Sequence, residues 1–290
     1  MSIVKSDADV DDRIIAVSDV RCRERRSGAG AERQVPHHEL VFVRRGVFVT
    51  HVGRQLLTAD SNHVVCVSGG TPVRFSHPTE DGDTFTKIEL PPAVARDLVT
   101  RYLPRLADAL ECPLPLACVA VTPALILKFH QLRAAFRDPI SGGLAVDEAA
   151  LQLVHDVVHV AHAMRGRLPI AVRAGTRRSR ADLVESTKLV IAAIPNAPLS
   201  LATLAHTAGS SPFHLAHVFR DEVGVPIHRY RLQLRLALAL DRIAEGEDNL
   251  SALGHELGFT SHSHFTRAFR AAYGQPPNQI RKRFASGRVV

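Results

Sequence analysis

The sequence predicts an α+β protein of two domains: an antiparallel β-barrel or sandwich with trailing helices, followed by an all-helical domain. Three observations predict this order. Short runs rich in Val, Phe, Ile and Thr recur through residues 36–90. From residue 93 onward, apolar residues recur three and four apart, which is typical of helices. Two segments near the end of the chain repeat each other. With 290 residues, the chain is long enough to bury two cores.

The strands are expected where the apolar runs are separated by turn residues such as Asp60-Ser61-Asn62 and Gly69-Gly70. The expected strands are ELVFVRR (39–45), GVFVTHV (46–52), RQLLTA (54–59), HVVCVS (63–68), PVRFSH (72–77) and TFTKIEL (84–90). Their regular spacing predicts a small antiparallel barrel or sandwich.

Helical periodicity begins after Pro91-Pro92, and helices are expected over 93–110, 123–137 and 141–164. The segment RGRLPIAVRAGTRRSR combines Gly, Pro and clustered arginine without a clear period, which indicates a linker. The predicted organisation is therefore a first domain over 1–164, a linker over 165–180 and a second domain over 181–290.

Charge and composition narrow the class of function. From Thr176 to the end there are 15 Lys and Arg against 9 Asp and Glu, a net of +6 of the chain's total of +7. This asymmetry favours a second domain that binds a polyanion. The sequence has no apolar run of eighteen residues and no secretory leader, which predicts a soluble, cytoplasmic protein without a membrane partner. Its four cysteines form no C-x-x-C pair, so we expect reduced thiols.

The internal repeat pairs LATLAHTAGSSPFHLAHVFRDEVGVP (201–226) with LSALGHELGFTSHSHFTRAFRAAYGQP (250–276). In each copy a short helix should end at a glycine, Gly209 or Gly258, which adopts a left-handed conformation at little cost. Serine or threonine hydroxyls follow and can cap a second helix. This is helix-turn-helix geometry, and a long apolar-striped helix through residues 227–246 should join the two units.

The second helix of each unit has a side for the core and a side for a ligand. The core side should carry Leu215, Val218 and Phe219 in one copy, and Phe265, Ala268 and Phe269 in the other. The outward side is expected to enter a DNA major groove. The expected DNA-binding residues are Phe213, Ala216, His217, Arg220, His262, Ser263, Thr266, Arg267 and Arg270.

These residue types have distinct chemistry toward DNA. Arg267 can pair with guanine through two hydrogen bonds, and His262 and Ser263 can reach base edges or phosphate. Phe213 and Ala216 can offer apolar contact to thymine methyl groups. Arg220 and Arg270 are placed for phosphate.

Residues 183–284 resemble the DNA-binding domain of the AraC/XylS family of bacterial transcription regulators. The resemblance rests on the GF…F-x-R-x-F…G-x-P-P pattern in LSALGHELGFTSHSHFTRAFRAAYGQPP. Two positions depart from the family: Gly254 replaces the usual alanine, and His217 replaces the usual arginine of the first unit. The first helix-turn-helix unit is therefore expected to contact bases more weakly than the second, or only when His217 is charged.

The same resemblance implies the rest of the organisation. PHHELVFVRRG and SGGTPVRFSHP are similar to the sheet motifs of the family's cupin-like sensing domain. It implies a small-molecule effector, a homodimer held through helices 92–164, promoter DNA and RNA polymerase as partners, and activation rather than repression. The implied effector-pocket residues are His38, Phe42, Arg44, Phe75 and His77.

The sequence also suggests two alternative functions. A metal-dependent cupin enzyme with a DNA-binding tail is the alternative, since His37, His38, Glu39 and His77 fall in its motif regions. Their spacing does not match a metal cupin, so no metal, cofactor or catalytic residue is assigned and the chain is not expected to be an enzyme.

His262 and His264, two apart on a helix, do not converge on one metal ion. His155, His159 and His162 lie along one side of a predicted helix, and the first two have the spacing of zinc ligands. We expect these histidines to form a polar helix face and not a metal site. A third reading is a non-specific DNA-coating protein.

Overall fold

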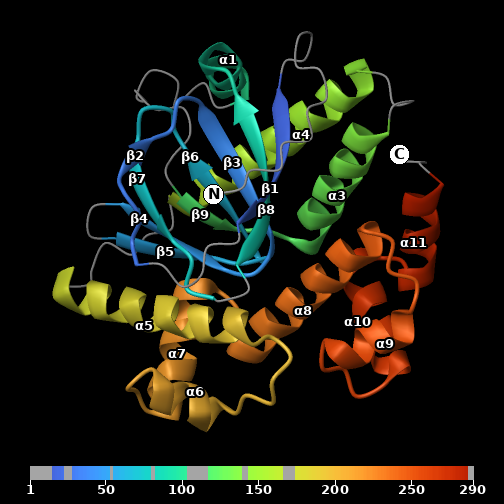
Figure 1. The fold of residues 1–290 in the computed structure, drawn as a ribbon. Helices are drawn as coiled ribbons and strands as arrows, with labels where there is room; N and C mark the ends of the chain where they lie inside the picture. The colour runs from blue at the N-terminus through green and yellow to red at the C-terminus, as the bar shows by residue number, and fades with distance from the viewer. Residues whose placement is uncertain are drawn as a thin grey trace. The chain divides into compact units, whose positions relative to one another are not determined.

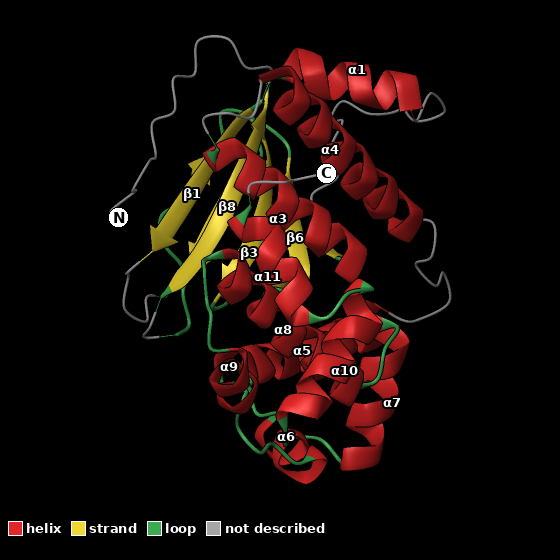
Figure 2. Cartoon of the chain, turned by 90° about the vertical axis from the view of Figure 1, so that its right-hand side faces the viewer, coloured by secondary structure: helices red, strands yellow, loops and turns green. Residues whose placement is uncertain are grey.

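The structure is a computed structural model that describes residues 15–22, 28–52, 55–79, 82–102, 117–138, 143–165 and 174–286. The chain divides into two compact units, Met1–Arg167 with Lys282–Val290, and Leu168–Arg281. Figures 1 and 2 show that the strands belong to the first unit and that the second is built of helices. The expected two-domain α+β class is confirmed. Among the described residues, no helix is both long enough and apolar enough to cross a bilayer.

The first unit holds two antiparallel sheets (Figure 1). The five-stranded sheet has the order β1-β8-β3-β6-β9 and the four-stranded sheet the order β2-β7-β4-β5. The strands are β1 (Ala16–Cys22), β2 (Arg33–Gln34), β3 (His38–Arg45), β4 (Phe48–Val52), β5 (Gln55–Ala59), β6 (His63–Val67), β7 (Pro72–Ser76), β8 (Asp83–Leu90) and β9 (Ala117–Ala120). All six expected strands are present, and β1, β2 and β9 are additional.

The turn between β5 and β6 shows why the strands end where they do. The carboxylate of Asp60 accepts hydrogen bonds from the Asn62 amide at 2.9 Å and from the His63 ring at 2.8 Å. An aspartate that bonds to the backbone two residues on closes a tight turn without help from a distant part of the chain.

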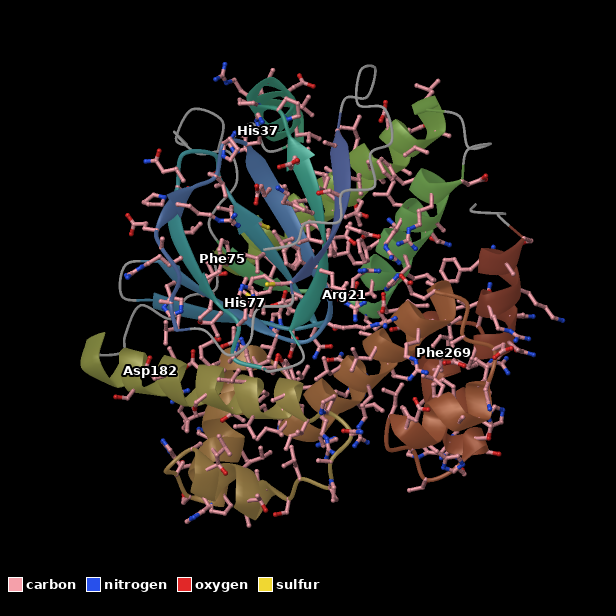
Figure 3. All side chains as sticks on the ribbon, viewed as in Figure 1. Arg21, His37, Phe75, His77, Asp182 and Phe269 are labelled. Atoms are coloured by element: carbon pink, nitrogen blue, oxygen red, sulfur yellow. The ribbon has the colours of Figure 1, made fainter. Side chains whose placement is uncertain are left out.

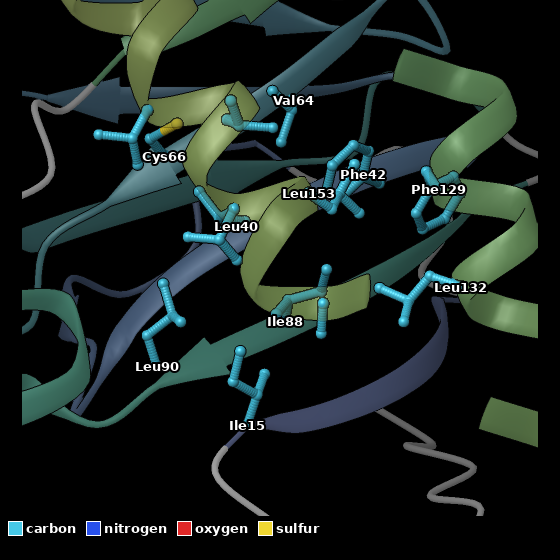
Figure 4. Packing of buried hydrophobic residues seen from close by; sticks show 14 of the residues in the cluster. Ile15, Leu40, Phe42, Val64, Cys66, Ile88, Leu90, Phe129, Leu132 and Leu153 are labelled. Atoms are coloured by element: carbon cyan, nitrogen blue, oxygen red, sulfur yellow. The ribbon is translucent and has the colours of Figure 1, made fainter. Parts of the chain in front are cut away.

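Alternation along β3 divides the hydrophobic residues between two cores. Leu40 and Phe42 join a cluster with residues of the following helices, whereas Val41 and Val43 join a cluster shared by the two sheets. Phe42 stacks on Phe129 with ring centroids 4.4 Å apart and planes inclined by 3°, and Figure 4 shows this contact. Full burial of such a side chain stabilises the fold by roughly 1.5–3 kcal/mol.

The helices of the first unit are α1 (Pro92–Tyr102), α3 (Pro123–Arg137) and α4 (Gly143–Arg165). The Thr122 hydroxyl caps α3 by accepting a hydrogen bond from the Leu125 amide at 3.3 Å, and Pro123 occupies the first turn, where no amide proton is needed. The helix expected over 123–137 is confirmed at both ends. Residues 103–110 of the first expected helix lie outside the described residues.

A partly buried ion-pair network joins β1, β8 and α3. Asp19 Oδ2 accepts hydrogen bonds from Arg133 Nη2 at 2.9 Å and from Arg137 Nη2 at 2.6 Å, while Oδ1 accepts from the Thr86 hydroxyl at 2.5 Å. Burial alone would raise the pKa of the Asp19 carboxyl, but hydrogen bonds and charge from Arg133, with Arg44 nearby, hold it well below its usual range.

The second unit is formed by consecutive helices. They are α5 (Ala174–Ala193), α6 (Leu201–Thr207), α7 (Pro212–Val223), α8 (Ile227–Ala244), α9 (Leu250–Glu256), α10 (His262–Tyr273) and α11 (Pro277–Ala285), the last of which crosses the unit boundary. The linker expected over 165–180 is partly wrong: Arg165 ends α4, and residues 174–180 form the first turns of α5. Residues 166–173 lie outside the described part.

Candidate nucleic-acid interface

Two helix pairs, α6–α7 and α9–α10, repeat the same local structure. The turns contain Gly209 at φ +64° and Gly258 at φ +77°, in the left-handed region that favours glycine. The Ser211 and Ser261 hydroxyls then cap α7 and α10 by accepting hydrogen bonds from backbone amides at 3.2 and 3.1 Å. The glycine and serine positions in the sequence therefore build two similar turns, the second of which is one residue longer.

The inner faces of α7 and α10 hold both helices to the core. Leu215, Val218 and Phe219 are fully buried, as are Phe265 and Phe269. The two phenylalanines of α10 meet edge to face with centroids 5.6 Å apart, which adds to their burial. Ala268, expected on the same side, is only partly buried.

The α8 helix lies between the two pairs in sequence and contacts both α7 and α10. Tyr230 meets Phe219 edge to face at 5.3 Å, which fixes the first pair to α8. At the second pair, Arg235 donates to the Pro195 carbonyl at 2.8 Å and to the Gly258 carbonyl at 3.1 Å. Burial lowers the pKa of Arg235 to about 10. Arg235 therefore adds to the positive charge of the unit, but its guanidinium group joins parts of the unit to each other through these backbone carbonyls.

The outer face of α10 presents the predicted polar row. His262, Ser263, Thr266, Arg267 and Arg270 line one shallow hollow, together with Ala271 and Gly274. The His262 ring lies 3.4 Å from the Thr266 hydroxyl, and the Arg267 and Arg270 side chains are exposed. The structure thus brings together all five residues that the sequence assigned to DNA on this helix.

The outer face of α7 has a different character. Phe213 is 84% exposed and stacks on the His217 ring, with centroids 6.4 Å apart and planes inclined by 1°. His217 Nε2 lies 3.3 Å from Asp221 Oδ2, one helical turn later. Ala216 is half-buried and Arg220 is exposed. This helix offers a flat aromatic surface.

Charge also differs between the two helices. Arg180 on α5 pairs with Asp221 at 3.1 Å and with Glu222 at 2.7 Å. Neither acid has a counterpart on α10, where alanines, Ala271 and Ala272, occupy the equivalent positions 50 residues later. The strong positive face toward a polyanion is therefore that of α10.

The histidines of α4 and α10 considered as metal ligands have other partners. His264 contacts the Thr260 hydroxyl at 3.1 Å and the Phe259 ring at 5.5 Å, away from His262. His155 stacks near His159 with centroids 6.2 Å apart, and its Nδ1 lies 3.3 Å from the Asp156 carboxylate. The side chain of His162 lies outside the described residues. None of these described histidines belongs to a group of three possible metal ligands.

Two of the five residues expected to form an effector pocket, Phe42 and Phe75, lie in different hydrophobic clusters. Phe42 stacks on Phe129 on the helix-covered side of its sheet. Phe75 packs against Phe48 at 5.8 Å, in the cluster that the two sheets share. The expectation of one pocket fails for this pair, because the two rings belong to different clusters.

The remaining residues of that expected pocket have local roles. The buried His38 ring accepts a hydrogen bond from the Gly69 amide at 3.2 Å, and burial lowers the pKa of His38. Arg44 is buried, and its carbonyl accepts a hydrogen bond from the Ser61 hydroxyl at 2.7 Å. His77, labelled with Phe75 in Figure 3, contacts Asp83 and Cys22.

Sequence reasoning missed two features of the helical unit. Arg180 pairs with residues of α7 that are more than 40 positions away in the chain, and no local sequence pattern predicts such a contact. At Gly254 an added Cβ would lie 3.2 Å from Phe265 side-chain atoms. The glycine in place of alanine therefore gives the Phe265 ring room to approach α9.

Comparisons with known proteins agree with this geometry. Residues 204–283 match a family model described as a helix-turn-helix domain. A putative AraC-like transcription regulator of Streptomyces lividans is 32% identical over 145 residues, covering 50% of this chain and 46% of that protein. The probable transcriptional regulator LumQ of Photobacterium leiognathi is 36% identical over 81 residues, covering 28% and 33%. The matches thus span less than half the length of these relatives.

Among solved structures, ToxT from Vibrio cholerae aligns over 93% of this chain and 98% of its own, with 11% identity and a TM-score of 0.39.

Proposed function

We propose, on the premise that this chain is an AraC/XylS family member by its C-terminal domain, that it is a sequence-specific DNA-binding transcription regulator. The observation that carries the proposal is the outer face of α10, where His262, Ser263 and Arg267 line one hollow together with the exposed Arg270. These side chains suit contacts to base edges and, for Arg270, to phosphate. The relatives described above are transcription regulators, which favours this function over the enzyme alternative.

The two helix pairs form the reading unit. Buried side chains hold α7 and α10 to α8, so both recognition helices belong to one helical unit and can engage successive major-groove segments. The α10 helix supplies hydrogen bonds and charge, whereas Phe213 and Ala216 on α7 supply apolar contact to thymine methyl groups. The DNA segment that α10 contacts therefore contributes more to sequence preference than the segment that α7 contacts, and the strongest preference is for the base pair that Arg267 contacts.

The β-sheet unit is the sensing part of the proposal. Its two antiparallel sheets suit a cupin-like barrel that binds a small-molecule effector, and helices within 92–164 supply a dimer contact. Effector binding would shift the population between arrangements of the two domains, which alters contact with promoter DNA and RNA polymerase and leads to activation. The site of action is the cytoplasm.

Selection of binding sites from random duplex DNA tests the function with the full chain. We expect a single enriched motif, bound at least about 1,000-fold more tightly than bulk DNA at the same salt concentration. The control is the same selection with a scrambled motif as competitor. Binding that bulk DNA displaces as readily as the selected motif would identify a DNA-coating protein and refute sequence-specific regulation.

A further inference from the structure

A cysteine, a histidine and an aspartate meet at one end of the β-sheet unit. Cys22 is the last residue of β1 and Asp83 the first of β8, and the two stand directly opposite each other in the antiparallel register. His77 follows β7 and comes between them (Figure 3 labels it). Opposite residues of an antiparallel pair place their Cβ atoms about 4.5–5.5 Å apart, so the strand pairing itself brings the thiol and the carboxyl together.

The contacts within this cluster orient the histidine ring. His77 Nδ1 lies 2.5 Å from Asp83 Oδ2, and His77 Nε2 lies 3.6 Å from Cys22 Sγ. One ring nitrogen is thus held by a carboxylate, and the other faces a sulfur. Metal-binding histidines are commonly held in this way, with a carboxylate on the nitrogen that does not bind the metal.

Burial makes the charge of this cluster costly unless it is balanced. Cys22 is 5% exposed, and the Asp83 side chain is fully buried. The second carboxylate oxygen, Asp83 Oδ1, is buried and has no hydrogen-bond partner among the described residues. A buried carboxylate oxygen without a donor favours a cation close by.

The distances fit a transition metal. Zn–S and Zn–N bonds of about 2.3 and 2.05 Å at a tetrahedral angle place sulfur and nitrogen about 3.6 Å apart, the separation found between Cys22 Sγ and His77 Nε2. One ligand atom from each of the three residues lies within 4.8 Å of the other two. A thiolate and a carboxylate together carry the two negative charges that a dication balances.

We propose that Cys22, His77 and Asp83 form a binding site for a first-row divalent transition metal in the β-sheet unit. Cys22 Sγ and His77 Nε2 are the ligands, and Asp83 holds the ring through Nδ1. Since a tetrahedral metal has four positions, this set leaves room for water or for an anionic group of a small molecule. The proposal does not depend on DNA binding, and it contrasts with the absence of a metal expected from the sequence.

Metal uptake by the full chain tests the site. The protein is stripped with a chelator, incubated with Zn²⁺, desalted and analysed for bound metal. We expect one equivalent in the wild type and in the Cys118→Ser control. Cys22→Ser and His77→Gln should abolish this uptake, and Asp83→Asn should weaken the affinity by about 10- to 100-fold. Equal uptake by Cys22→Ser, or none by the wild type, would overturn the proposal.

Two measurements on the unaltered protein guard against variants that fail to fold. Co²⁺ added to the stripped wild type should give a thiolate-to-cobalt charge-transfer band in the near ultraviolet. Zn²⁺ should slow alkylation of Cys22, mapped by mass spectrometry, and leave the rate at Cys118 unchanged. A spectrum without that band, together with Cys22 alkylation that is fast and indifferent to Zn²⁺, would instead assign the cluster to a thiol activated by histidine.

Discussion

The glycines of the two helix-pair turns provide a matched pair for testing how α9 and α10 are held. Gly209 and Gly258 occupy the same place in the two copies, and both have positive φ. A Cβ added at Gly209 meets nothing within 4 Å, whereas at Gly258 it would lie 2.8 Å from Arg235 Nη2 and 3.0 Å from the Asn196 carbonyl oxygen. Alanine at either position has the same backbone problem, but only Gly258→Ala displaces a neighbour.

The expected magnitudes follow from these contacts. A left-handed backbone costs alanine about 1–2 kcal/mol at either site. At Gly258 the Arg235 guanidinium must also move, which weakens hydrogen bonds to the Pro195 and Gly258 carbonyls worth about 1 kcal/mol each. We therefore expect Gly209→Ala to lower the free energy of unfolding by about 1–2 kcal/mol and Gly258→Ala by about 2–4 kcal/mol.

Urea unfolding followed by far-ultraviolet circular dichroism measures both losses. The Arg235→Ala background supplies a double-mutant cycle, in which the additional cost at Gly258 should fall toward the cost at Gly209. Equal losses for the two alanine variants in the wild-type background would show that Arg235 does not hold the second turn in place.

Two further predictions concern the ion-pair network and the recognition helices. Asp19→Asn should lower the free energy of unfolding at neutral pH by roughly 2–3 kcal/mol. The fold lowers the pKa of Asp19. The contribution of Asp19 to the free energy of unfolding is therefore complete above about pH 3.9, the pKa of aspartate in the unfolded chain, and decreases as the pH falls below that value. The gap in urea midpoint between variant and wild type should shrink below about pH 4, and a constant gap would contradict the ion pair. Phe213→Ala should weaken DNA binding without changing its salt dependence, whereas Arg270→Ala should reduce the slope of log affinity against log salt by about 1. A changed salt slope for Phe213→Ala would argue against purely apolar contact.

Local sequence patterns predicted the parts of this fold that are held by local interactions. The turns at Asp60 and at Gly258 need only the side chain or the backbone freedom of residues close in the chain, and both appear where expected. The same holds for α3, whose Thr122 cap and Pro123 are visible in the sequence. The outer row of α10 follows from helical periodicity once Phe265 and Phe269 are assigned to the core.

The features that escaped prediction depend on distant pairing. The β9 strand is four residues long, and so short an apolar run cannot be distinguished from part of a helix until it pairs with β6. The family resemblance implies Phe42 as an effector-pocket residue, but the pleat of β3 turns this side chain toward the helices. The cluster of Cys22, His77 and Asp83 arises from the β1–β8 register, which joins residues about 60 apart in sequence.

In the proposed function Arg267 reads a base from the outer face of α10, and site selection with Arg267→Ala tests this role. Binding sites are selected from random DNA for the wild type, for Arg267→Ala and for Arg96→Ala, a control with the same charge change at an exposed position of α1. Arg267→Ala should lose about 1–3 kcal/mol on the wild-type motif and its preference at one base pair, while Arg96→Ala keeps the motif. An unchanged motif for Arg267→Ala, with every position as strongly preferred as before, would show that Arg267 does not read a base.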